Sequence, residues 1–275
     1  MGEMGEEMGG EGFSLNIPKN KQLAILAVFL IIVGAVYFSG VWKIPLETPT
    51  PKTEMLIIGA PSQALVTILD QDNSLVYYKI QDATQFETTP GQQLEQYDIV
   101  LLDQHLADSA FGQSVSRQFG EAIENFVRTG GKLIVVLDSG IYRSGPEGSV
   151  AADVIGWKSN FGTIMPVECD IGQGEKPTCE TVVSLQGRIK RQDISHKIMI
   201  GVENAPASPS LPPYSLKTFD VKPIGSTVAI IEDEGSSKSF PAIMEKKTLL
   251  GKTIYFNYDP ALTPGIVQNT LEYLR

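Results

Sequence analysis

The sequence predicts an α/β fold with a mostly parallel sheet flanked by helices, antiparallel additions in the second half, and one N-terminal transmembrane helix. An uncharged apolar run, residues 23–42, predicts the membrane helix. After it, apolar runs alternate with amphipathic segments as far as residue 138, which is typical of strand–helix–strand units in a parallel sheet. Beyond that point the strand patterns follow one another too closely for helical crossovers, which indicates antiparallel pairing.

The composition is that of a folded protein with an acidic surface. The chain has 275 residues, of which 42% are apolar and 20% charged, and its net charge is −10. This apolar content is enough to build a core. An acidic domain repels phosphate backbones, so no nucleic-acid partner is expected.

The apolar run reads LAILAVFLIIVGAVYFSGVW. As a helix it is about 30 Å long, the thickness of a hydrocarbon core, so residues 22–42 are expected to contact the lipid bilayer. A cleaved signal peptide and a buried core helix are the alternatives. The run is longer than a signal core and lacks a small-x-small cleavage site, and it is apolar on every face, so a retained anchor is favoured.

This anchor divides the chain into four predicted parts. They are a disordered cytoplasmic head (1–20), the transmembrane helix (21–42), a Pro/Thr linker (43–54) and an α/β domain (55–275). The flanking lysines barely orient the helix. The short head and the cysteine pair described below favour a single-pass cell-membrane protein with its C-terminal domain outside the cytoplasm.

The first half of the domain shows apolar strands with Gly-rich joins. The expected strands are Met55–Ala60, Ser74–Ile80, Tyr97–Asp103 and Lys132–Asp138, and the expected helices are Ser62–Asp70 and Ser114–Arg128. Thr129-Gly130-Gly131 is a typical helix end. These elements predict the parallel part of the sheet.

The second half is expected to be rich in strands. They are Thr163–Val167, Thr181–Leu185, Ile198–Val202, Thr218–Val221, Thr227–Glu232 and Thr253–Tyr258. A C-terminal helix is expected over Pro264–Leu274, with Thr263 as its cap and Pro264 at its first position.

Residues 54–275 resemble the class I glutamine amidotransferase-like superfamily, which implies a flavodoxin-like sheet. The segments that carry the resemblance are MLIIGA, YDIVLLDQH, AIENFVRTGGKLIVVLDSG, DISHKIMIGV and the close FPAIMEKKTLLGKTIYF. The family's Gly-x-Cys-x-Gly elbow is replaced by Leu137-Asp138-Ser139-Gly140-Ile141, and His196 is followed by Lys197-Ile198 instead of x-Glu. Glutamine hydrolysis is therefore excluded, and the resemblance implies a fold without a function.

Cys169 and Cys179 are the only cysteines, and they bracket a Gly- and Pro-containing turn. A disulfide that closes a hairpin is the favoured interpretation, and it requires an oxidising compartment. Half of a metal site and two unrelated thiols are the alternatives. With only two histidines in the chain, a metal site is poorly supplied with ligands.

Ser139 follows a strand at its carboxyl end, where open α/β sheets place ligands. His105 as base and Asp138 as its orienting partner would complete a nucleophilic set. The alternative is a simple turn, because Asp, Ser and Gly favour turns. Asp103, Asp138 and Asp259 each end an apolar strand, so they form either a cation site or caps that accept backbone N–H bonds, and caps are favoured. No cofactor or metal is expected, and His196 is interpreted as structural.

The sequence favours a non-enzymatic domain, a membrane-anchored sensor or scaffold. It would bind a ligand or a partner protein through Asp103, Gln104, His105, Asp138 and Ser139. Two alternatives stay open: a hydrolase that uses Ser139 or an Asp-bound metal, and an accessory subunit of a transport or surface assembly whose head meets a partner.

Overall fold

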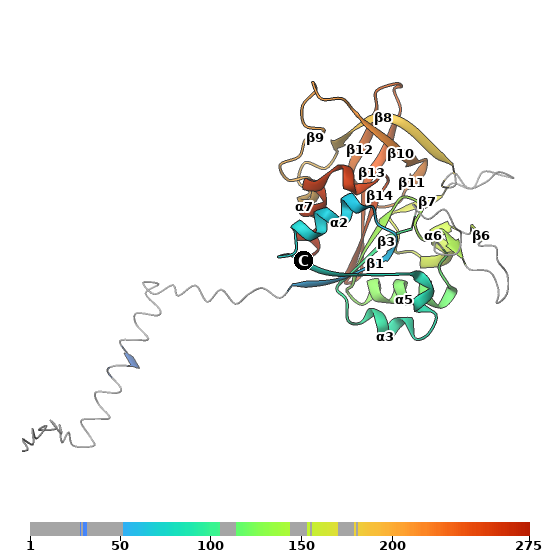
Figure 1. Ribbon diagram of the computed structural model, residues 1–275, viewed down its shortest axis with the longest axis vertical. Helices are drawn as coiled ribbons and strands as arrows, with labels where there is room; N and C mark the ends of the chain where they lie inside the picture. The colour runs from blue at the N-terminus through green and yellow to red at the C-terminus, as the bar shows by residue number, and fades with distance from the viewer. Residues whose placement is uncertain are drawn as a thin grey trace, which may run out of the picture. The chain divides into compact units, whose positions relative to one another are not determined.

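The computed structural model describes Val28, Leu30–Ile31 and residues 52–104, 114–143, 153–154, 156–169, 179 and 181–275. The chain divides into two units, Met1–Thr50 and Pro51–Arg275. The fold below is that of the second unit (Figure 1). In the first unit, Val28 and Leu30–Ile31 are helical.

The membrane prediction is contradicted. Over the described ranges, no helix combines the length and the apolar character needed to cross a bilayer. The predicted transmembrane helix and the predicted single-pass location at the cell membrane are therefore not borne out by the described residues. Apart from the three helical residues just named, the predicted span 21–42 and the head before it lie outside the described residues.

The second unit alternates strands and helices as far as β4 and is then dominated by strands. Its helices are α2 (Gln63–Gln71), α3 (Pro90–Leu94), α5 (Arg117–Arg128), α6 (Gly156–Phe161) and α7 (Pro264–Leu274), with short 3-10 turns η1 (Ala83–Phe86), η3 (Lys197–Met199) and η4 (Pro260–Leu262). The strands of the main sheet are β1 (Thr53–Gly59), β2 (Val76–Gln81), β3 (Ile99–Asp103), β4 (Lys132–Val136), β8 (Val182–Arg191), β9 (Asn204–Ala205), β10 (Tyr214–Phe219), β12 (Ser226–Asp233), β13 (Ser239–Thr248) and β14 (Gly251–Phe256). Two small ribbons pair β5 (Tyr142–Arg143) with β6 (Asp153–Val154) and β7 (Val167–Cys169) with β11 (Val221–Pro223).

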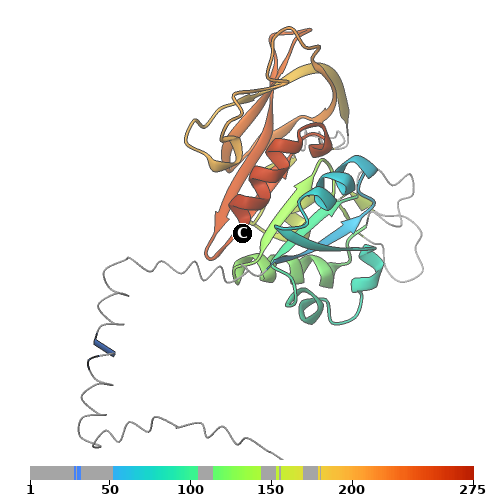
Figure 2. The same cartoon turned by 60° about the vertical axis from the view of Figure 1, so that its left-hand side comes forward.

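The main sheet is mixed. Its strand order is β10-β8-β12-β13-β14-β4-β3-β1-β2, with β9 paired to β8. Four strand pairings are parallel and five are antiparallel. The prediction of a mostly parallel, flavodoxin-like sheet is therefore wrong, because antiparallel pairings outnumber parallel ones. Figure 2 shows the antiparallel strands, coloured yellow to red, continuing the sheet beyond the blue and green parallel strands.

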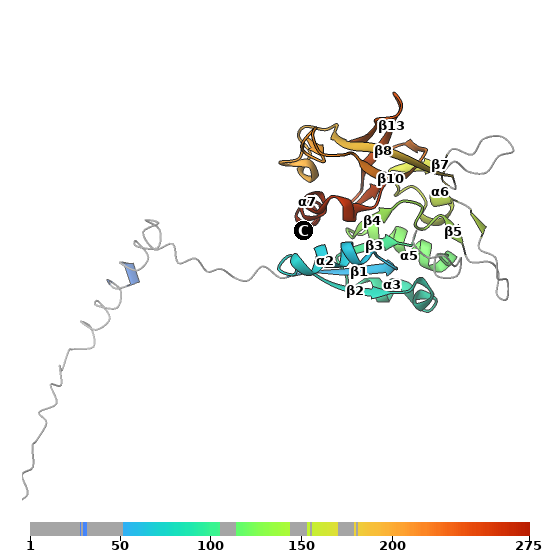
Figure 3. The same cartoon turned by 45° about the horizontal axis from the view of Figure 1, so that its top comes forward.

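Helices cover both faces of the parallel strands, so these strands are apolar on both sides. One core lies between the sheet and α2 and α7, and includes Met55, Leu69, Ile134 and Leu271. The other lies against α3, α5 and α6, and includes Leu56, Phe119, Val135 and Trp157. Figure 3 shows α2 and α7 on the opposite side of β1, β3 and β4 from α3 and α5. Successive residues of one strand thus enter opposite cores.

Local signals place the helix ends. Ser116 begins α5, because its Oγ accepts a hydrogen bond from the Phe119 backbone N–H at 3.1 Å. Helix α7 spans the range expected from the sequence, but Thr263 does not cap it through its side chain. The Thr263 Oγ1 lies 2.8 Å from the Tyr258 hydroxyl instead, inside the core. The packing of Tyr258 therefore decides the role of Thr263.

Several second-half predictions were wrong in detail. Residues 198–202, expected as a strand, contain the end of η3 and a turn, and residues 163–166 precede β7 instead of forming a strand. The long strand β13 is absent from the expected set. Residues 240–244 of β13 are an apolar run, and the polar, lysine-containing residues 245–248 follow it. A short apolar run does not by itself distinguish a strand from a segment of a buried helix.

Candidate functional site

A cavity of about 370 Å³ lies at the carboxyl ends of β4 and β14. It is lined by Leu137, Asp138, Val182, Ser215, Lys217, Phe219, Asp259 and Leu262. In an open α/β sheet, ligands bind outside the carboxyl ends of the parallel strands, because the loops that follow the strands converge there. The position of this cavity therefore makes it the candidate site.

The turn after β4 aims Asp138 at the cavity. Leu137 has a φ of +53°, a left-handed conformation that a branched side chain adopts at a cost. Its backbone N–H donates to the Phe256 carbonyl at 2.8 Å, and the Ser139 N–H donates to the Val136 carbonyl at 3.1 Å. The reversal of the chain is therefore tied to both strands. Strain of this kind is typical of functional turns, where the surrounding structure holds an unfavourable backbone in place.

Asp259 approaches the same cavity from the segment after β14. Its Oδ1 accepts a hydrogen bond from the Ala261 backbone N–H at 2.9 Å, so it caps η4. This capping role is the one favoured from the sequence. The hydrogen bond fixes the carboxylate while the side chain still lines the cavity. Two carboxylates from two neighbouring parallel strands thus border one space.

The antiparallel part of the sheet supplies the facing wall. Ser215, Lys217 and Phe219 alternate along β10, and all three line the cavity. Asn257, which is fully buried, holds Phe219 in place: its Oδ1 accepts from the Phe219 N–H at 3.0 Å, and its Nδ2 donates to the Phe219 carbonyl at 2.8 Å. Sequence reasoning missed these four residues, because only the tertiary structure brings β10, which pairs with β8, into contact with Asn257 at the end of β14.

The residues expected to bind a ligand divide into two groups. Asp138 lines the cavity, whereas Asp103, Gln104 and Ser139 are 1%, 1% and 2% exposed. The Gln104 backbone N–H donates to the Ser139 Oγ at 2.8 Å, and the Trp157 indole N–H donates to the Ser139 carbonyl at 2.9 Å. The structure thus joins the ends of β3 and β4 through Ser139. His105 lies outside the described residues.

The described residues contain one disulfide and no cluster of metal-ligating side chains. Within these residues no group of three or more His, Cys, Asp or Glu side chains is placed to hold a metal ion. Cys169 and Cys179 are joined by a disulfide, with their Cα atoms 5.3 Å apart. This bond ties the end of β7 to the segment that precedes β8.

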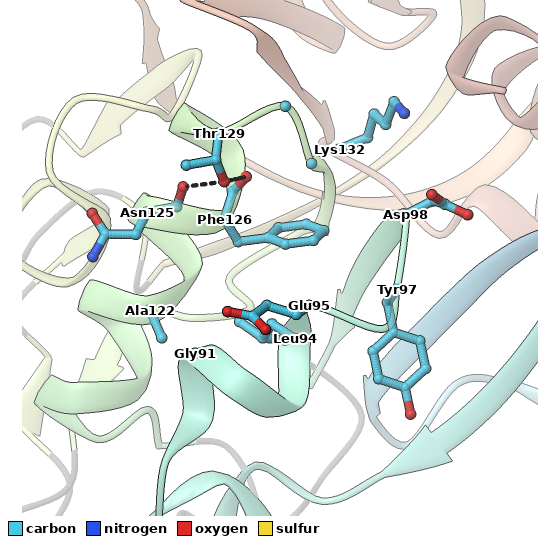
Figure 4. Close-up of a pocket in the computed structure, with 12 residues that line it drawn as sticks. Gly91, Leu94, Glu95, Tyr97, Asp98, Ala122, Asn125, Phe126, Thr129 and Lys132 are labelled. Carbon is cyan, nitrogen blue, oxygen red and sulfur yellow. Dashed lines mark hydrogen bonds between the residues drawn. The ribbon is translucent and has the colours of Figure 1, made fainter.

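A second cavity of about 390 Å³ lies at the opposite, amino ends of β3 and β4 (Figure 4). Its walls come from α3 and the end of α5, and they include Leu94, Ala122 and Phe126. Tyr97 and Asp98, the two residues that precede β3 in the chain, also line this cavity. It lies away from the strand ends where catalytic loops gather, so we treat the first cavity as the candidate site.

Comparison with known proteins supplies structural likeness only. No family model matches the chain, and no curated protein sequence matches it. A solved β-galactosidase from Bacillus circulans sp. alkalophilus matches with a TM-score of 0.51 and 15% identity, over 80% of this chain and 31% of that one. A β-galactosidase from Rahnella sp. R3 matches with a TM-score of 0.49 and 12% identity, over 82% and 31%. An exo-β-1,4-mannosidase from Opitutaceae bacterium strain TAV5 has a TM-score of 0.40 and 10% identity, over 82% and 34%.

These findings correct two predictions. The chain spans about a third of the length of the structures that it matches, and these structures are glycosidases, not glutamine amidotransferases. The resemblance stated from sequence motifs was therefore wrong. The expectation of a non-catalytic sensor or scaffold was built on that resemblance and is corrected together with it. Of the three, the Bacillus circulans enzyme has a TM-score above 0.5, and at its low identity it shows the fold alone.

Proposed function

We propose that the chain is a hydrolase of glycosidic bonds, and that the cavity at the ends of β4 and β14 is its active site. The observation that carries the proposal is the pair of carboxylates, Asp138 and Asp259, on the border of one cavity. Hydrolysis of a glycosidic bond needs one carboxyl group to protonate the leaving oxygen and a second to attack or to activate water. The fold likeness to a β-galactosidase supports this substrate class.

The remaining lining fits a sugar. Ser215 and Lys217 offer hydrogen-bond donors to hydroxyl groups, and the Phe219 ring offers an apolar surface to a sugar's C–H face. Asp259 is oriented by the Ala261 N–H, so we assign it the attacking or base role. Asp138, on the strained turn, is then the proton donor. In this arrangement Ser139 positions the turn and takes no part in the chemistry.

Turnover of a panel of nitrophenyl glycosides tests the proposal. We expect Asp138→Asn and Asp259→Asn each to lower kcat/KM by at least about a hundredfold, the usual contribution of acid–base groups. Asp220→Asn is the matched control, because Asp220 is exposed and follows Phe219 without lining the cavity. An equal loss in the control, or retained activity in both cavity variants, would contradict the proposal, as would a wild-type protein that turns over no member of the panel.

One further variant distinguishes the proposed carboxylate mechanism from a serine hydrolase that uses Ser139 as its nucleophile. Ser139→Ala removes the acceptor of the Gln104 N–H, so its folding is checked by circular dichroism before its activity is read. We expect it to retain turnover per folded molecule. Complete loss of hydrolysis in folded Ser139→Ala, with activity retained in Asp259→Asn, would instead assign the nucleophile to Ser139.

A further inference from the structure

Three lysines lie side by side across three neighbouring strands. Lys247 of β13 pairs with Lys252 of β14, and Lys252 pairs with Lys132 of β4. Side chains of residues directly paired on adjacent strands point to the same face of the sheet. These three residues, called the lysine row below, therefore form one line at the amino ends of β4 and β14.

The lysine row belongs to the face covered by α7. The Lys252 Nζ lies 4.0 Å from the centre of the Tyr273 ring, and Tyr273 is in the last turns of α7. Lys132 is among the residues that line the second cavity, but Figure 4 shows its side chain directed away from Phe126 and Leu94. Lys197 of η3 is close enough for its charge to act on the row. Burial is the largest cause that lowers the pKa of Lys252. The charge of Glu245 raises this pKa, and the charges of Lys247, Lys132 and Lys197 lower it further.

The positive charge of the row is only partly compensated by its described neighbours. Lys247 Nζ lies 3.8 Å from the Glu245 Oε2, and the same carboxylate bonds His196 and Tyr273. The carbonyl end of α7 adds about half a negative charge. Like charges directly opposite each other in a sheet are destabilising. The mutual repulsion of the three lysines is therefore an unfavourable free energy that an anionic ligand would offset. The row is a local positive site in a chain whose net charge is −10.

We propose that the lysine row binds an anionic carbohydrate chain, one that carries sulfate or carboxylate groups. Adjacent strands lie about 4.8 Å apart, so the three charges are spread over about 10 Å and suit repeated anionic groups better than one small ion. The row and the Asp138/Asp259 cavity lie at opposite ends of β4, about 17 Å apart for five residues. A chain reaches both, whereas a single sugar does not. The carbohydrate class rests on the proposed function; the preference for a multivalent anion does not.

Calorimetric titration of the full chain with heparin tests the inference, with dextran as the neutral polymer. The test variant is Lys132→Gln/Lys247→Gln, which leaves Lys252 on Tyr273. The control is Lys79→Gln/Lys222→Gln, two exposed lysines of β2 and β11 away from the row. We expect heparin to bind with an affinity that falls at least tenfold in the test variant and less than twofold in the control. Raised salt should weaken wild type more than the test variant.

Four results would overturn the inference. They are equal binding of dextran, unchanged affinity in the test variant, an equal loss in the control, and displacement of heparin by inorganic pyrophosphate at matched charge. Phosphatidylserine vesicles that bind through the row more tightly than heparin would assign it to lipid and also reject a carbohydrate ligand. Asp138→Asn separates the two proposals, because we expect it to abolish hydrolysis and to leave heparin binding intact.

Discussion

The Nε2 of His196 lies 3.2 Å from the Oε2 of Glu245, which connects the segment before η3 to strand β13. The Nδ1 of His196 accepts a hydrogen bond from the Ile198 backbone N–H, so in the neutral ring the proton is on Nε2 and is donated to Glu245. The other carboxylate oxygen, Oε1, accepts from the Tyr273 hydroxyl at 2.5 Å. Glu245 is 4% exposed, and this network satisfies it.

The network predicts a stability that falls in acid. Burial alone would raise the pKa of Glu245, but hydrogen bonds from His196 and Tyr273 and the charges of His196 and Lys247 outweigh it, so the pKa lies below the usual 4.5. A depressed carboxyl pKa stabilises the fold above the unfolded-state pKa and loses that contribution as the pH falls through the folded one. We expect the free energy of unfolding to decline below about pH 4.5.

Urea unfolding between pH 3 and pH 7 measures this effect. Glu245→Gln should cost about 1–3 kcal/mol at pH 7, because a buried charged hydrogen-bond partner is lost, and its stability should depend less on pH in the acid range. Glu87→Gln is the control, since Glu87 is exposed. Parallel acid profiles for wild type and Glu245→Gln would show that this carboxylate does not carry the dependence.

Asn257 should be among the least replaceable residues of the fold. Its Oδ1 accepts from the Tyr255 hydroxyl and from the Phe219 N–H, and its Nδ2 donates to the Phe219 and Pro241 carbonyls. Asn257→Asp removes both donors and sets a carboxylate against two carbonyls. We expect a loss of about 2–4 kcal/mol in unfolding free energy and weaker ligand binding, because Phe219 is released. Asn73→Asp, at an exposed site, should change stability by less than about 0.5 kcal/mol, and equal losses would refute this role.

Gly59 and Gly91 are a test position and its control for replacing glycine by alanine. Gly59 has a φ of +118°, and a Cβ there would lie 2.1 Å from the Asp103 carbonyl oxygen, so Gly59→Ala must push β1 from β3. Gly91, in α3, has no atom within 4 Å of such a Cβ. We expect a loss of at least about 2 kcal/mol for Gly59→Ala and no loss for Gly91→Ala, read from chemical denaturation. A Gly59→Ala protein of wild-type stability would contradict the close contact.

The disulfide should contribute measurably to stability. Its ten-residue separation predicts about 2–3 kcal/mol from the restricted unfolded chain. We expect Cys169→Ser/Cys179→Ser to lower the urea midpoint, and dithiothreitol to lower that of wild type while leaving the variant unchanged. A reductant effect of equal size on the variant would mean that the loss has another source.

The elements that could be read from sequence are those with a strong local signal. The apolar runs of β1, β3 and β4 and the periodic helices α5 and α7 lie close to their expected ranges. Asp138 and Asp259 could be singled out because each follows such a strand. Ser215, Lys217 and Phe219 carry no comparable signal, since their place in the cavity depends on the contact between Phe219 at the end of β10 and Asn257 after β14.

What the sequence by itself determined is where the chain extends, where it coils and which faces are apolar, because these follow from periodicity within a few neighbouring residues. The tertiary structure alone decided that antiparallel pairings outnumber parallel ones and that Lys132, Lys247 and Lys252 form one row. It also decided that His196 meets Glu245. The physical reason is the same in each case: a strand's side chains alternate by local geometry, but its neighbours and their register are chosen by the packing of residues distant in the chain.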